Sequence, residues 1–202
     1  MSVLAPPALA PVPTIGPPVP KRWTVAEFHQ LWEEGWFEGS RPMLLDGRIY
    51  QMAIPGPQHN VGVGLADYVL KAAFATGHWV RVQMPLVLGQ WSDPVPDLSV
   101  VVGSVRDHMA QPATAILVVE VADTSLTVDT GDKAELYAAG GIADYWVVDL
   151  NNRVLIVRRD PRPDPASQSG SSYATVLRLL PGQTVSPLAA TQPTVNVADL
   201  LP

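Results

Sequence analysis

The sequence predicts a domain of the α/β or α+β class, in which helices pack around a sheet. Three observations predict it. Short apolar runs typical of strands recur along the chain, two pairs of these runs are separated by tight-turn residues, and other segments carry apolar residues at helical spacing. At 202 residues, of which 47% are hydrophobic, the chain is expected to form one domain with a substantial core.

The helical segments are marked by capping residues as well as by spacing. Thr24 is a suitable N-cap, and Glu27 stands at the capping-box position of the helix that Gly35 ends. A later helical pattern stops at Gly140-Gly141. We expect helices at residues 25–34, 59–75, 132–139 and 197–201.

The strand segments are apolar runs bounded by turn residues. Asp46-Gly47 and Asn151-Asn152 each stand between two such runs, which is the sequence form of an antiparallel hairpin. We expect strands on both sides of these turns, within residues 43–52 and at 144–149 and 153–158, and further strands at 79–84, 86–88, 96–102, 115–123 and 173–179. Residues 103–114 are expected to form a loop or a short helix, and residues 159–172 a mobile loop.

Composition excludes several classes of protein. With 13 Lys and Arg against 19 Asp and Glu, the formal charge of −6 argues against coating of nucleic acid through bulk electrostatics, although a local basic site is permitted. The chain has no cysteine, so neither disulfides nor thiolate metal sites hold the fold together. Residues 1–22 form a proline-rich tail that we expect to be disordered, followed by a single domain over residues 23–202. Without a signal-like segment or a run of about 18 apolar residues, we expect a cytoplasmic protein.

One carboxylate stands inside the most apolar run. Residues 115–123 read as a central strand covered on both faces, yet Glu120 lies within them. Burying an unpaired charge costs several kcal/mol or shifts its pKa, so such a residue usually has a cation, a metal or several donors beside it. The sequence therefore predicts a partner for Glu120.

A metal site would provide that partner. Asp97 opens the preceding strand, so pairing of the two strands would bring its carboxylate toward Glu120, and Mg²⁺ prefers such oxygen ligands. The backbone carbonyl of Val121 could supply a further oxygen. Lys133, on the following helix, could hold or deprotonate a water on that ion, and such a group would hydrolyse phosphodiesters.

Each member of this group also has a structural alternative. Asp97 after a proline is a common way to enter a strand, and Glu120 could pair with an arginine. Lys133 in the first turn of a helix is, by itself, usually a solvated surface residue.

The same residues resemble the PD-(D/E)XK nuclease superfamily, in the form whose lysine has migrated to the next helix. Ala122 occupies the older lysine position. More specifically, the chain resembles the bacterial Uma-two family of restriction endonucleases over about residues 23–158. The resemblance rests on Thr24-Val-x-Glu-Phe, Leu44-Leu-Asp-Gly47, His59, Gln83-x-Pro85, Pro96-Asp-Leu-Ser-Val100, Val118-Val-Glu-Val121, Ser125, Lys133, Tyr137 and Tyr145-Trp-x-Val-Asp149.

The resemblance implies a restriction-endonuclease-like core, with a mixed central sheet flanked by helices and extra antiparallel hairpins. It implies Mg²⁺ or Mn²⁺ on Asp97 and Glu120, the catalytic-lysine role for Lys133, and DNA as substrate, with a homodimer required for double-strand cleavage. The chain departs from the family pattern at two positions. Met43 stands where a glutamate is common, which would leave one ligand short, and Arg48 replaces a frequent acidic residue and could touch a phosphate.

Other matched or basic residues keep two interpretations each. His59 could contact a phosphate or support the start of its helix, and Gln83 could lie beside the metal or satisfy buried backbone groups. We expect Tyr137, Tyr145 and Trp146 in the core. Arg158, Arg159 and Arg162 form the densest basic cluster, which could face DNA or mark a solvated strand end.

Three functions remain open from the sequence. The first is a metal-dependent DNA endonuclease. The second is a catalytically impaired nuclease-fold module that binds DNA or protein without turnover, which Met43 and the acidic charge favour. The third is a metal hydrolase acting on a small phosphate ester.

Overall fold

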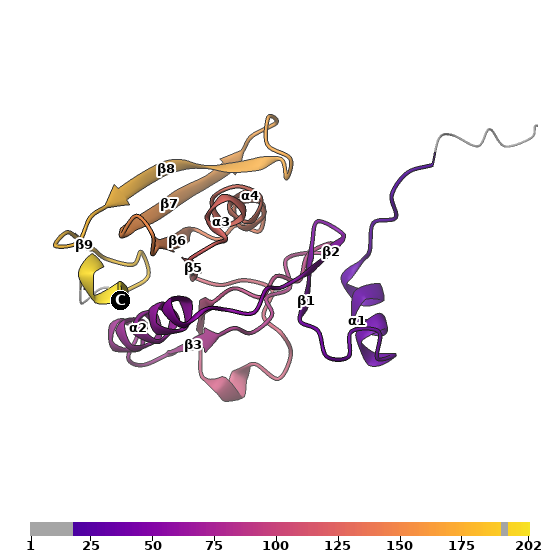
Figure 1. Ribbon diagram of the computed structural model, residues 1–202, viewed down its shortest axis with the longest axis horizontal. Coiled ribbons are helices and arrows are strands. Elements are labelled where there is room, and N and C mark those ends of the chain that lie inside the picture. The colour runs from indigo at the N-terminus through magenta and orange to yellow at the C-terminus, as the bar shows by residue number, and fades with distance from the viewer. Residues whose placement is uncertain (1–17, 191–193) are drawn as a thin grey trace, which may run out of the picture.

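A six-stranded mixed sheet forms the centre of the protein, with the strand order β3-β4-β5-β6-β7-β8 (Figure 1). The structure is a computed structural model that describes residues 18–190 and 194–202, so most of the expected tail, residues 1–17, lies outside the described part. The α/β (α+β) class predicted from the sequence is confirmed. No helix in the described ranges is long and apolar enough to cross a membrane.

Along the chain a helix comes first and a β-hairpin second, and further helices and strands follow in mixed order. The helices are α1 (Val25–Glu33), α2 (Pro57–Ala73), α3 (Leu126–Thr130) and α4 (Asp132–Ala139), with the short 3₁₀ helices η1 (Val105–Asp107) and η2 (Val197–Leu200). The strands are β1 (Pro42–Leu45), β2 (Arg48–Gln51), β3 (His78–Val82), β4 (Leu98–Val102), β5 (Leu117–Ala122), β6 (Asp144–Asp149), β7 (Val154–Pro163), β8 (Ser171–Leu179), β9 (Thr184–Val185) and β10 (Val195–Asn196).

Strands β5 and β6 pair in parallel, and every other neighbouring pair in the central sheet is antiparallel. A parallel pair needs a crossover connection, which α3 and α4 supply here. The strand pairs β1–β2 and β9–β10 form two separate small antiparallel sheets. In Figure 1, α1 stands beyond the β1–β2 hairpin, at the side of the main body.

The core has two layers, one on each face of the sheet. On one face, residues of α2 and η2 pack against alternate residues of β4, β5, β6 and β7. On the other face, α4 and residues of β1 pack against the remaining residues of the same strands. β5 is buried along its full length, as a central strand covered on both faces should be.

The local sequence signals predicted most elements correctly. The capping box between Thr24 and Glu27 is present at the start of α1. Asp46 and Gly47 both adopt positive φ angles, of 47° and 75°, which is the geometry of a type I′ hairpin turn. In the second hairpin the residue with positive φ is Arg153 rather than either asparagine, so the connection is longer than the two-residue turn that was expected.

Two expectations from the sequence are wrong, the first of them in part. Residues 159–163 and 171–172 are strand, because β7 continues to Pro163 and pairs with β8 from Ser171 onward, and only residues 164–170 form the connecting turn. Pro161 is tolerated there since β6 pairs with β7 only as far as Arg159, so the other side of β7 is an open edge. Residues 86–88 form only an isolated bridge from Leu88 to Ser92 rather than a strand.

Candidate functional site

The register of β4 and β5 brings the two predicted carboxylates together. Leu98 pairs with Val119, so Asp97, one residue earlier, stands opposite Glu120. The Val121 backbone N–H donates to Asp97 Oδ2 over 2.9 Å, and the Asp97 N–H lies 3.4 Å from Glu120 Oε2. The sequence-based prediction that these two residues converge therefore agrees with the structure.

Lys133 reaches Glu120 from the first turn of α4. Its Nζ lies 3.0 Å from Glu120 Oε2 and 3.0 Å from Asp129 Oδ1. The residue is buried, so the alternative of a solvated surface lysine is wrong. Gly131 makes this arrangement possible, because a Cβ at that position would meet the Thr127 carbonyl oxygen at 2.8 Å where α3 gives way to α4.

Asp129 is a site residue that the sequence reasoning missed. It is buried, lies on α3, and accepts a hydrogen bond from Ser125 Oγ in addition to pairing with Lys133. Its spacing of four residues from Lys133 was the available signal, since such pairs face each other on a helix. The signal was hidden because α3, a five-residue helix, had not been predicted.

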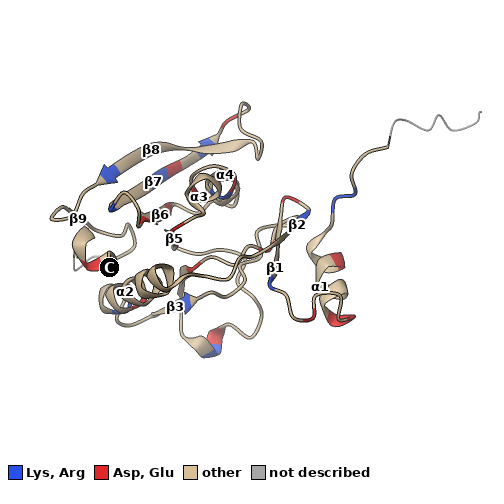
Figure 2. Ribbon diagram, in the orientation of Figure 1, with Lys and Arg blue, Asp and Glu red and all other residues tan. Residues whose placement is uncertain are grey.

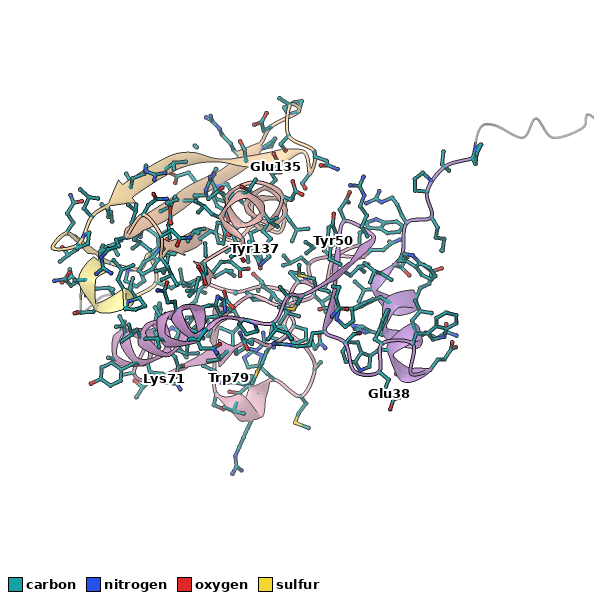
Figure 3. All side chains as sticks on the ribbon, in the orientation of Figure 1. Glu38, Tyr50, Lys71, Trp79, Glu135 and Tyr137 are labelled. Carbon is teal, nitrogen blue, oxygen red and sulfur yellow. The ribbon has the colours of Figure 1, made fainter. Side chains whose placement is uncertain are left out.

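Two tyrosines complete the polar network behind Glu120. Tyr137 on α4 donates to Glu120 Oε1 over 2.7 Å, and Tyr145 on β6 donates to the Asp129 carbonyl oxygen over 2.7 Å. Their rings contact each other, with centroids 4.9 Å apart, and Figure 3 labels Tyr137 between α4 and the sheet. Both residues are core residues as expected, and their hydroxyls additionally orient the site.

His59 bridges two of the three oxygens proposed for a cation. Its Nε2 lies 3.1 Å from Asp97 Oδ1 and its Nδ1 lies 2.9 Å from the Val121 carbonyl oxygen. An imidazole that donates from both nitrogens carries a positive charge. The hydrogen bond to Asp97 accordingly raises the pKa of His59, against the effect of burial.

Gln83, Met43 and Arg48 occupy different places relative to this cluster. Gln83 Nε2 lies 3.4 Å from Asp97 Oδ1, and Arg41 Nη2 lies 3.4 Å from Gln83 Oε1. Met43 lines the same cavity as the carboxylates and packs into the core layer on the α4 side. Arg48 instead lines a small neighbouring hollow, so the structure does not bring it to the carboxylates.

The remaining arginines of the basic cluster have internal partners. Arg159 Nε donates to Asp144 Oδ1 over 2.8 Å, and Arg158 Nη2 donates to the Thr130 carbonyl oxygen over 2.9 Å. Arg162 is exposed. Two of the three side chains therefore serve the fold.

The buried charges of the site are unevenly balanced. Burial raises the pKa of Glu120 to about 8, with the Lys133 charge opposing this rise and the Asp129 and Asp97 charges adding to it. Burial also acts to raise the pKa of Asp97, but His59 and the Val121 N–H outweigh it and lower that pKa. Burial acts to lower the pKa of Lys133, but the charges of Glu120 and Asp129 raise it. Lys133 is therefore a permanent cation at neutral pH.

The cluster lies in a cavity of about 550 Å³. Asp97, Glu120, Asp129, Lys133 and His59 are among the polar residues that line it. The β1–β2 hairpin and the segment that leads to α2 supply much of the remaining wall, which includes Met43, Tyr50, Met52 and Ile54. A ligand in this cavity would contact both the charged cluster and an apolar wall.

The oxygens present suit a hard divalent cation. One imidazole lies against both Asp97 Oδ1 and the Val121 carbonyl oxygen, each on a different ring nitrogen, so a cationic group is already favourable beside each of these two atoms. Two carboxylates and one carbonyl are ligands that Mg²⁺ accepts together with waters. Among the described residues, no group of three or more acidic or histidine side chains is arranged to hold a metal ion, so the side-chain ligands are few.

Comparison with solved structures identifies the class of fold. The chain is similar to the crystal structure of a "putative nuclease" from Anabaena variabilis, with a TM-score of 0.65 and 18% sequence identity over 88% of this chain and 96% of that one. A search of curated proteins gives no match. The likeness shows that the mixed sheet and its helices form a nuclease-type fold.

The family follows from the sequence itself. A profile of the Uma2 (Uma-two) family, described as "putative restriction endonuclease", matches residues 25–192. The chain belongs to this family, as the sequence motifs had indicated.

Proposed function

We propose that the protein is a metal-dependent endonuclease that hydrolyses phosphodiester bonds in DNA. One observation carries the proposal: Asp97 stands opposite Glu120, whose Oε2 is 3.0 Å from Lys133 Nζ, within a cavity that a substrate can enter. Buried carboxylates and a buried lysine at one end of a cavity are costly to the fold and are typical of catalytic sites. Membership of the Uma2 family supports the same reaction class.

Asp97, Glu120 and the carbonyl oxygen of Val121 would hold Mg²⁺ or Mn²⁺. Such an ion supplies positive charge that polarises the phosphate and lowers the pKa of the attacking water. His59 contacts Asp97 Oδ1 and the Val121 oxygen, so its imidazole would compete with a cation for these two atoms. Gln83 would help to orient Asp97.

Lys133 acts in this proposal as a fixed positive charge. Its pKa is raised by Glu120 and Asp129, so its ammonium keeps its proton and does not serve as the general base. It would donate to a phosphate oxygen and stabilise the negative charge that develops in the transition state. Asp129, which also contacts Lys133 Nζ, would help Glu120 to hold Lys133 in place.

The test is nicking or cutting of plasmid DNA in Mg²⁺ or Mn²⁺. Wild type is compared with Asp97→Ala, Glu120→Ala and Lys133→Ala, and with Glu38→Gln, an exposed acid on the turn after α1 (Figure 3), as the matched control. We expect at least about a hundredfold loss in the three site variants and full activity in the control. Activity that survives all three changes would remove the proposal.

A second function is favoured by Met43. An apolar side chain lines the cavity where the family pattern commonly places a glutamate, which fits a nuclease-fold module that binds DNA or protein without turnover. Calorimetric titration with Mn²⁺ separates the two. Micromolar binding that disappears in Glu120→Ala supports the enzyme, whereas the absence of binding in wild type supports the module.

We further propose that residues 23–202 form one nuclease-like domain that acts as a cytoplasmic homodimer. Double-strand cleavage by one active site per chain requires two copies. Sedimentation equilibrium at micromolar concentration measures the state directly. A monomer at all concentrations, with or without DNA, would restrict the protein to nicking.

A further inference from the structure

The cavity joins the charged cluster to an apolar surface that the proposed hydrolysis does not itself require. Met43, Tyr50 and Met52, all from the β1–β2 hairpin and its end, form one wall, and Val95 and Val128 also line the cavity. Tyr50 and Met52 are half-buried (Tyr50 is labelled in Figure 3), and both pack against the core layer on the α4 side. This wall therefore presents an aromatic ring and two flexible thioethers beside the site.

The reactive groups lie deep. Glu120 is 1% exposed, and Asp97 and Lys133 are each 7% exposed. A phosphate must enter the cavity to reach them. In a paired duplex the stacked bases hold each phosphate on a stiff backbone, whereas an unpaired nucleotide can leave the stack and enter a pocket.

The charges around the cavity also disfavour a duplex. Asp123 and Asp132 line it together with the buried acids, while Arg41 is its exposed cation. Duplex binding depends on many contacts between phosphates and Lys or Arg, and in Figure 2 the basic residues are spread over separate elements of the fold instead of being gathered in one place. Single-stranded binding relies more on stacking of bases against aromatic side chains.

Gln83 connects the two parts of the cavity. Its backbone φ of 48° is unusual for a residue other than glycine, and such strain is retained where it aims a side chain. The Gln83 amide links Arg41 on one side to Asp97 on the other. A backbone phosphate beside Arg41 would therefore lie next to the carboxylate cluster.

We propose that this cavity binds one unpaired nucleotide of a DNA strand, with the base against Tyr50, Met43 and Met52 and a neighbouring phosphate at Arg41. This inference rests on the proposed DNA hydrolysis and names its substrate class as single-stranded DNA or DNA with a flap, bubble or frayed end. Tyr50 is then a specificity-determining residue that contacts substrate.

The binding test uses fluorescence anisotropy with 5′-labelled oligonucleotides of one sequence, presented single-stranded, as a blunt duplex and as a duplex with a single-stranded flap. Titrations are made in Ca²⁺ and in a chelator, with full-length protein. We expect the single strand and the flap to bind at least about tenfold more tightly than the blunt duplex, and Tyr50→Ala to remove about tenfold of that affinity. Equal or tighter duplex binding overturns the inference.

Matched variants keep the test decisive. Tyr50→Phe retains the ring and should retain the preference, and Tyr68→Ala, at a tyrosine on α2 that is 78% exposed and outside the cavity lining, should leave it unchanged. Thermal unfolding checks that each variant folds. If Tyr50→Ala folds and binds the single strand as wild type does, the pocket is wrong. If a deoxynucleoside 5′-monophosphate competes as strongly as the oligonucleotide, the occupant is a free nucleotide and the strand proposal fails.

Cleavage of the same three oligonucleotides in Mg²⁺ separates this inference from the proposed function. Preferential binding of the single strand that depends on Tyr50, without cleavage of any substrate, leaves the nucleotide pocket standing and removes hydrolysis. Faster cleavage of the blunt duplex, unaffected by Tyr50→Ala, keeps hydrolysis and removes the pocket.

Discussion

The two faces of β5 bury their side chains in different ways. Toward α2, Leu117, Val119 and Val121 belong to a cluster of buried apolar residues. Toward α4, Val118 and Ala122 flank Glu120, which contacts a lysine and a tyrosine hydroxyl. Neighbouring residues of one strand thus belong to a core that hydrophobic burial stabilises and to a core that depends on a balance of charges.

The imbalance on the α4 side is the informative difference. Glu120 and Asp129 share the single ammonium of Lys133, and Asp97 relies on His59. Removing the cation should therefore harm the fold, while removing one acid should relieve it. The apolar face should respond to neither pH nor metal.

The largest expected effect is that of Lys133→Ala. It leaves two buried carboxylates without their cation, and breaking a buried pair in this way costs about 3–5 kcal/mol of unfolding free energy. Urea denaturation at pH 8.5 without metal, where the Glu120 carboxyl is largely ionised, measures it. The double variant Glu120→Gln with Lys133→Met should recover part of the loss, and no recovery would contradict the shared-charge account.

Leu117→Ala makes the matching change on the apolar face. A fully buried leucine is removed, so we expect a loss of about 2–5 kcal/mol. The loss should be the same at pH 5 and pH 8.5, and calorimetry should give an unchanged Mn²⁺ affinity. A strong pH dependence of this loss would show that the two faces are not independent.

Glu120→Gln should stabilise the metal-free protein at high pH. Because the pKa of Glu120 is about 8 in the folded protein, above its ordinary value of 4.5, the folded state holds the proton more tightly. Stability therefore falls as pH rises from about 4.5 to about 8. The variant escapes this loss, so we expect it to be more stable than wild type by about 1–2 kcal/mol at pH 8.5 and equal to it near pH 4.5. Thermal unfolding of both proteins across this pH range measures the difference in stability. A variant that is less stable than wild type at pH 8.5 would refute the expectation.

Met43→Glu adds a carboxylate to the polar face. Met43 lines the cavity that holds Asp97 and Glu120, so an added acid should raise Mn²⁺ affinity about tenfold, or about 1.4 kcal/mol. Met43→Gln, of similar size and without charge, is the control and should bind as wild type does. Equal affinities in both variants would mean that position 43 lies outside the reach of the ion.

Local signals in the sequence were sufficient for most of the fold. The capping box of α1, the turn at Asp46-Gly47 and the apolar run of β5 are interactions between near neighbours, so their residue types specify them. The strand extension through Pro161 could not be read in the same way. Pro161 is tolerated there because β6 leaves this part of β7 unpaired on the side away from β8, which is a property of the assembled sheet.

The sequence alone also indicated which residues form the candidate site. Three features together are unusual enough to indicate a site where the strands meet. They are a carboxylate in a buried strand, an aspartate at the start of the preceding strand, and a lysine on the following helix. The order of the motifs likewise determined the family.

The balance of charges among these residues depends on the tertiary structure. Asp129 enters the site because α3 breaks at Gly131 and turns its acid toward Lys133, and Tyr137 donates to Glu120 because α4 packs on that face of the sheet. His59 comes from 62 residues away to bridge Asp97 and the Val121 carbonyl. Contacts of this kind depend on packing between distant elements, whose geometry no local pattern of residue types encodes.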